Sequence, residues 1–229
     1  MVDREERAAH PEHRWPVVAA VLIALGLYTF LPSGLFEAQR YVVVGLGLVL
    51  MVPLVILTPH RYTKETRFSR LAEVGLALIL VAANQLTLAL LIMQLVHKSD
   101  NGGALLLASL QVWVTNVIAF AGLYWCLDRG GPVARVTQPR ADLRLADFRF
   151  PQDEDDDTVI EVAAGSSEKS DWVATYVDYL YFSLTNSMAF SPTDTMPLTT
   201  RAKALMGLES FAGFVMLALV IARAVAQIG

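Results

Sequence analysis

The sequence has few charged residues, which make up 17% of its 229 residues, whereas soluble domains carry about 25%. Hydrophobic residues make up 55%, and the mean hydropathy is +0.46. This balance argues against an ordinary soluble domain, because so few charges would leave much of its surface apolar. The apolar residues form blocks of helical length, so we expect an all-α membrane protein.

Cysteine and the common catalytic motifs are also scarce or missing. The single cysteine, Cys126, excludes an intramolecular disulfide and has no metal-ligand residues at a useful spacing. The sequence contains no G-x-S-x-G, no H-E-x-x-H and no Gly-rich phosphate loop. We therefore expect neither an enzyme nor a metal site, and neither a cofactor nor a nucleic-acid partner.

Five apolar blocks are long enough to cross a hydrocarbon core of about 30 Å, which takes about 20 helical residues. They are Trp15–Phe36, Tyr41–Leu57, Leu71–Val96, Ala104–Leu127 and Leu198–Ile228. The first block has no A-x-A cleavage site after it, so we expect it to be retained and not removed as a secretion signal. The blocks divide the chain into a four-helix transmembrane region (1–127), a polar linker (128–171) and a C-terminal region (172–229).

Basic residues gather on alternate loops. They precede the first span, fill the loop 61–70 and recur in the linker, whereas Arg40 and Lys98 are isolated on the opposite side. Because cytoplasmic loops retain positive charge, the N-terminus and the linker are predicted to be cytoplasmic, in a bacterial inner membrane. The surrounding partner is then the lipid bilayer.

The linker begins with DRGGP, whose glycines and proline stop a helix. The acidic run DEDDD, Asp153–Asp157, lacks the glycine and distal glutamate of a calcium loop, so we expect a solvated, partly disordered stretch. The segment DLRLADFRF, Asp142–Phe150, alternates apolar and charged residues. It is predicted either to lie along the membrane surface or to pack on the helix that follows.

Polar side chains within the apolar blocks are costly at membrane depth, so each is a candidate functional residue. Asn84 and Gln85 lie in the third block and Asn116 in the fourth, and interhelical hydrogen bonding is favoured over a pathway lining. Glu209 lies inside the last block. A neutral Glu209 in a structural hydrogen bond is favoured over a direct role in conduction or proton transfer.

A short helix over Tyr176–Ser187 is predicted before the last block, and it is too short to cross a bilayer. From Asp178 the chain reads DYLYFSLTNSMAFSPTDTMPLTTRAKALMGLESFAGFVMLALVIARAV. This segment resembles the pore module of two-span potassium channels, in which a pore helix precedes a TVGYGD filter and an inner helix. The resemblance places Thr185, Asn186 and Ser187 in the pore helix. It places a filter-like loop at Ala189, Phe190, Ser191, Pro192, Thr193 and Asp194.

The filter-like loop differs from the potassium-channel family at the positions whose backbone carbonyls coordinate the ion. Both filter glycines are missing, with Ser191 and Thr193 in their places, and Pro192 fixes φ and removes an N–H. Potassium filters replace the hydration shell of the ion with backbone carbonyls. A potassium-selective filter is therefore not expected.

DRGGP and AFSPTDTMPL together also resemble an actinobacterial family of multi-span membrane proteins without an established activity. The channel resemblance implies an extracellular linker, whereas the basic residues place the linker inside. If 173–190 crosses the membrane, the chain has six spans; if it is re-entrant, the chain has five and the C-terminus lies outside.

Two functions are compatible with these features. The first is a weakly selective cation channel, tetrameric by analogy, with Asp194 as a charged ring. The alternative is a non-conducting membrane scaffold or regulatory protein. In that alternative the degenerate pore loop is a packed element, and Pro192 and Asp194 serve as turn and capping residues for the last helix.

Overall fold

The computed structural model describes residues 12–31, 37–57, 66–96, 102–188 and 194–228, and these are mainly helical. Five helices coincide with the predicted apolar blocks: α1 (Trp15–Thr29), α2 (Glu37–Leu57), α3 (Arg67–Val96), α4 (Gly102–Leu127) and α9 (Thr200–Ile228). Among the described residues, α3, α4 and α9 are long and apolar enough to cross a membrane. The apolar helices α1 and Arg40–Val49 within α2 are shorter.

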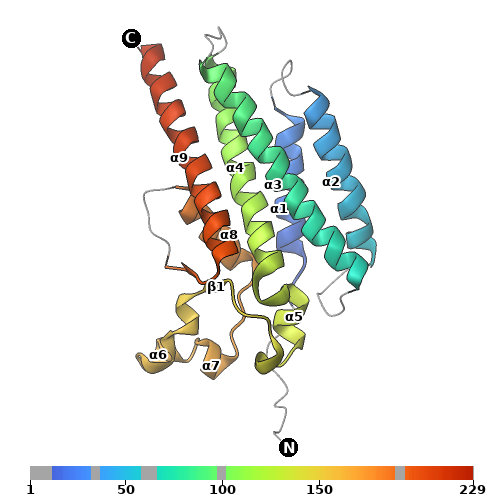
Figure 1. Cartoon of the computed structure of the whole chain (residues 1–229), viewed down its shortest axis with the longest axis vertical. Helices are drawn as coiled ribbons and strands as arrows, with labels where there is room; N and C mark the ends of the chain where they lie inside the picture. The colour runs from blue at the N-terminus through green and yellow to red at the C-terminus, as the bar shows by residue number, and fades with distance from the viewer. Residues whose placement is uncertain (1–11, 32–36, 58–65, 97–101, 189–193, 229) are drawn as a thin grey trace, which may run out of the picture.

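The five long helices form a bundle in which α4 is central (Figure 1). It packs against α1, α3 and α9, and its residues Phe120, Ala121 and Leu123 have no exposed surface. Its middle turns are enclosed by these helices, and its polar residues Thr115 and Asn116 bond to α3. The start of α1 and the end of α9 lie at opposite ends of the bundle (Figure 1).

Short elements of the segment 128–171 form a cap at the end of the bundle where α1 starts and α4 ends (Figure 1). They are η1 (Asp128–Gly130), α5 (Pro132–Thr137), η2 (Arg140–Asp142), β1 (Phe148–Arg149), η3 (Pro151–Asp153), η4 (Asp155–Asp157), α6 (Ile160–Ala163) and α7 (Ser167–Ser170). As predicted, DRGGP ends α4. Gly131, with a φ of 98°, lies immediately before Pro132, the first residue of α5.

The cap differs from the solvated, partly disordered linker that the sequence predicts. All residues of 128–171 are described, and Asp147, Phe148 and Phe150 are buried. The rings of Phe148 and Phe150 lie 4.9 Å from Phe182 and 5.3 Å from Tyr179, centroid to centroid. Of the two alternatives for Asp142–Phe150, the structure shows the second for Phe148 and Phe150, which pack on the helix that follows. Arg149 between them stays partly exposed.

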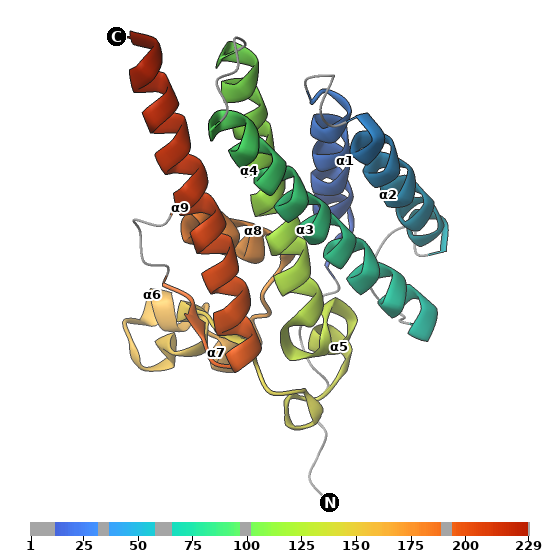
Figure 2. The ribbon, with the colours of Figure 1, turned by 45° about the horizontal axis from the view of Figure 1, so that its top comes forward.

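The short helix α8 (Tyr176–Ser187) has the bounds expected from the sequence. It begins with a capping box, in which the Thr175 N–H and hydroxyl both donate to Asp178 Oδ2, at 2.7 and 2.8 Å. α8 packs against α4 and α9 (Figure 2). After it, β2 (Met196–Pro197) pairs antiparallel with β1, so the chain is back at the cap before α9 begins.

Candidate functional site

The C-terminal end of α8 contacts α9 at a glycine. A Cβ atom placed on Gly213 would lie 2.1 Å from the carbonyl oxygen of Ser187. Backbone cannot yield as a flexible side chain can, so only glycine permits this approach. Because Gly213 lies near the middle of α9, the end of α8 reaches about halfway along that helix.

Glu209 of α9 is the centre of the contact among α4, α8 and α9, and its side chain has no exposed surface. Tyr124 of α4 donates its hydroxyl to Glu209 Oε2 at 2.7 Å, and Asn186 of α8 donates Nδ2–H to the same oxygen at 2.6 Å. The hydroxyl of Ser183, also in α8, contacts Glu209 Oε1. One carboxyl group therefore joins three helices.

Asn186 extends this network by using both ends of its amide. Its Nδ2 also donates to the Met206 carbonyl at 3.2 Å, and its Oδ1 accepts from the Ser210 hydroxyl at 2.9 Å. An amide with two donors and two acceptor sites is thereby held on both sides by α9. The polar contacts fix how far α8 inserts and also its rotation about its own axis.

Ser183 shows how the carboxyl group can be neutral here. Its hydroxyl lies 2.9 Å from the Val117 carbonyl, which can only accept a hydrogen bond, and it also contacts Glu209. A serine hydroxyl has one hydrogen. If that hydrogen goes to Val117, a protonated Glu209 can donate to Ser183; if it goes to Glu209, an ionised carboxylate is accommodated.

Two further hydroxyls of α8 are bonded within the helix. The hydroxyl of Thr185 donates to the carbonyls of Tyr181 and Phe182, and that of Ser187 donates to Leu184. The exposed face of α8 is mainly apolar, consisting of Val177, Tyr181, Leu184 and Met188. The sequence predicted Thr185, Asn186 and Ser187 as pore-helix residues. In the structure, the polar groups of all three side chains bond within the same chain.

The filter-like loop is described only at its end. Ala189, Phe190, Ser191, Pro192 and Thr193 lie outside the described residues, whereas Asp194 is described and exposed. The expectation that Asp194 caps the last helix is wrong. A capping residue must directly precede the first turn of its helix, and α9 begins at Thr200. The Thr199 hydroxyl, and not Asp194, accepts the Ala202 N–H, at 3.2 Å.

The polar residues of α3 and α4 bond to each other across the helix interface. Asn84 donates to the Val112 carbonyl at 2.9 Å and to the Thr115 hydroxyl at 2.7 Å, while Gln85 donates to Asn116 Oδ1 at 2.9 Å. These contacts match the interhelical alternative that the sequence favours.

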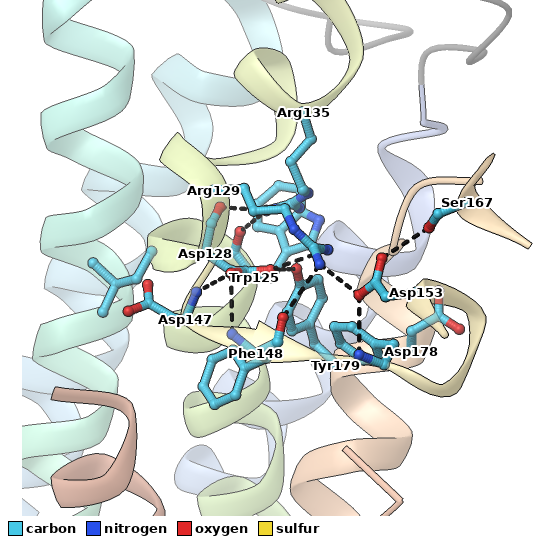
Figure 3. A network of polar contacts seen from close by, with 12 residues as sticks. Trp125, Asp128, Arg129, Arg135, Asp147, Phe148, Asp153, Ser167, Asp178 and Tyr179 are labelled. Carbon is cyan, nitrogen blue, oxygen red and sulfur yellow. Dashed lines mark hydrogen bonds and ion pairs between the residues drawn. The ribbon is translucent and has the colours of Figure 1, made fainter. Parts of the chain in front are cut away.

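A second polar network joins the cap to α8 and α4, as Figure 3 shows. Asp128, fully buried, accepts from the Tyr179 hydroxyl at 2.6 Å and from the Asp147 N–H at 2.7 Å. Arg135 donates to the Trp125 and Asp128 carbonyls at 2.8 and 3.0 Å, and its guanidinium lies 5.0 Å from the Tyr179 ring centre. Sequence analysis missed this network, although an aspartate directly after a span was a usable signal.

Further ion pairs extend this network over the cap. Arg129 pairs with Asp153 at 2.5 Å, and Asp153 also accepts from the Ser167 hydroxyl at 2.8 Å (Figure 3). At the start of α9, Arg201 pairs with the buried Asp147. In the part of the chain that the structure describes, no group of three or more His, Cys, Asp or Glu is placed to hold a metal ion.

Glu12, just before α1, binds the start of α8. Its Oε1 accepts the Tyr176 N–H at 2.6 Å, and its Oε2 accepts the Trp125 indole N–H at 2.9 Å. Burial raises the pKa of the Glu12 carboxyl above its ordinary value, although both hydrogen bonds act in the opposite direction. Glu12 thus connects the start of α1 to α8 and α4, and burial disfavours the charged form of its carboxyl group.

This raised pKa predicts how Glu12 contributes to stability at different pH values. The folded state holds the proton more tightly than the unfolded state, so the contribution is full at acid pH and is lost as the pH rises through the raised pKa. We expect the thermal midpoint of the wild type, minus that of Glu12→Gln, to fall as the pH rises above the ordinary glutamate pKa of 4.5. A difference that stays flat or rises with pH would contradict this assignment.

Comparison of the chain with protein-family models, curated proteins and solved structures finds no match. The resemblance to the potassium-channel pore module therefore rests on the residues of 178–225 alone. It contributes an expectation about architecture, and function must be argued from the site itself.

Proposed function

We propose that this protein is a multi-pass membrane protein in which α8 is a re-entrant half-helix used as a fixed structural element, and that the protein is a non-conducting scaffold. The observation that carries this proposal is the bonding of α8. Asn186 and Ser183 bind Glu209, while Thr185 and Ser187 bond to carbonyls of α8 itself. A water-filled path needs polar groups that face it, and the exposed side of α8 is mainly apolar.

The proposed placement in the membrane follows from the ends of the helices. α8 starts at the cap, ends beside Gly213, and is followed by β2, which pairs with β1 in the cap. Non-helical backbone at membrane depth is tolerated where protein covers it. With five crossing helices and a cytoplasmic cap, the C-terminus is external, and paired reporter fusions should place the two termini on opposite sides.

The second candidate function, cation conduction, is favoured by a single feature. Asp194 and Asp178 line a polar pocket of about 210 Å³ together with Thr185 and Thr195. Two carboxylates at the end of the bundle nearest the cap would attract cations to a pore, if one formed between subunits.

Ion flux distinguishes the two candidates. Liposomes that contain the protein are expected to show no cation flux above empty liposomes at either sign of voltage, and Asp194→Asn should leave this unchanged. Asp194 is exposed and does not cap α9, so the thermal midpoint of Asp194→Asn should be close to that of the wild type. A cation current that Asp194→Asn reduces severalfold, in a protein that forms tetramers, would overturn the scaffold proposal in favour of a channel.

A further inference from the structure

Beyond the C-terminal end of α8, the space between α4 and α9 contains a cavity of about 410 Å³. α8 fills only part of the gap between these two helices, and α9 leans away from α4 toward its C-terminus (Figures 1 and 2). Ser187 and Met188 form one end of the cavity. Its walls are mainly large apolar side chains, including Leu106, Leu110, Trp113, Met216, Leu217 and Val220.

The cavity offers little to a polar ligand. Among the described residues, two hydroxyls line it, those of Ser109 and Ser187, and each donates its hydrogen to a carbonyl of its own helix, Leu105 at 2.8 Å and Leu184 at 2.9 Å. A water molecule in a buried site needs two to four polar partners. The chemistry of the walls therefore selects a hydrocarbon.

The cavity is elongated along the two helices. It extends along α4 from Leu106 to Trp113 and along α9 from Gly213 to Val220, which is about 10 Å at the helical rise. A linear hydrocarbon chain can lie along such a space between the two helices.

We propose that this cavity binds one hydrocarbon chain of a membrane lipid, which enters from the bilayer between α4 and α9 and ends against α8. The inference rests on the proposed membrane placement of α4 and α9, and does not depend on whether the protein conducts ions. A bound chain would contact Ser187 and Met188 at the end of α8. The lipid chain is then a structural ligand of the half-helix.

Native mass spectrometry of the purified full chain tests this proposal, with dioleoylphosphatidylcholine and dioleoylphosphatidylglycerol as probes. The wild type is expected to retain one molecule of either lipid per chain, and not to retain glycerophosphocholine, which lacks chains. Leu110→Trp should lower lipid occupancy at least tenfold by filling the cavity. Leu107→Trp is the matched control, because Leu107 is similarly exposed on α4 (53% against 56%) and does not line the cavity.

A second pair on α9 protects the test against a variant that fails to fold. Leu217→Trp fills the cavity from the other side, and Leu208→Trp is its control outside the lining. Equal lipid occupancy in all four variants, or retention that requires one particular headgroup, would overturn the proposal. So would a lipid-free dimer whose subunits separate in Leu110→Trp and Leu217→Trp, since a second copy would then occupy the cavity. Reporter fusions test the membrane placement separately.

Discussion

Gly213→Val is expected to displace the end of α8 from α9 and to lower the free energy of unfolding by about 3 kcal/mol or more. Overfilling a packed contact usually costs about 1 to 3 kcal/mol, and here the added atoms meet main chain. The ideal Cβ position lies 2.1 Å from the Ser187 carbonyl oxygen and 3.0 Å from its carbonyl carbon. The thermal midpoint in detergent, followed by helical circular dichroism, measures the effect.

Gly207→Val is the matched control for this substitution. Gly207 lies on the same helix, and a Cβ atom placed on it has no neighbour within 4 Å. Because valine is no worse than glycine in a helix, the control should change stability by less than about 1 kcal/mol. If the two variants melt at the same temperature, the close approach of α8 to α9 at Gly213 is wrong.

Two substitutions of Glu209 by residues of similar size should differ in their effect on stability. Glu209→Leu leaves the Tyr124 hydroxyl and one Asn186 N–H facing an apolar side chain. Unsatisfied buried donors cost about 1 to 3 kcal/mol each, so we expect a loss of about 3 kcal/mol. The thermal midpoint measures this loss of stability. Cross-linking measures whether α8 keeps its contacts with α4 and α9.

Glu209→Gln is expected to remain within about 1 kcal/mol of the wild type. Its carbonyl oxygen can replace Oε2 as the acceptor for Tyr124 and Asn186, while its amide group can donate to the Ser183 hydroxyl, which can donate to Val117. A severe loss of stability in Glu209→Gln would mean that the network requires an ionised carboxylate. Normal stability with loss of an ion flux would support the conduction candidate.

The sequence was sufficient for the five apolar helices, for the short helix α8 and for some of the buried polar residues. Tyr176–Ser187 could be predicted because a run of about twelve polar and aromatic residues is followed by turn residues before the last apolar block. Glu209 stood out because a carboxyl group within an apolar block needs a partner. Its partners could not be predicted, since Tyr124, Ser183 and Asn186 lie 85, 26 and 23 residues away.

The cap shows why the linker was harder to predict. Its acidic run suggested solvation, and charge does keep Glu154 and Asp157 exposed. The same segment also contains the phenylalanines of DFRF, which bury against Tyr179 and Phe182. Short apolar motifs carry too little periodicity to reveal a packed segment, because their burial depends on a surface formed elsewhere in the chain.

Hydrogen–deuterium exchange of α8 in lipid nanodiscs tests most directly the claim that α8 is a fixed element held by Glu209. The backbone amides of 180–187 are expected to be as protected as those in the middle of α4 in the wild type and in Glu209→Gln. In Glu209→Leu, protection should fall by at least tenfold in α8 while α3 remains unchanged. If the α8 amides of the wild type exchange within seconds, or respond equally to both substitutions, α8 is not held by this carboxyl group.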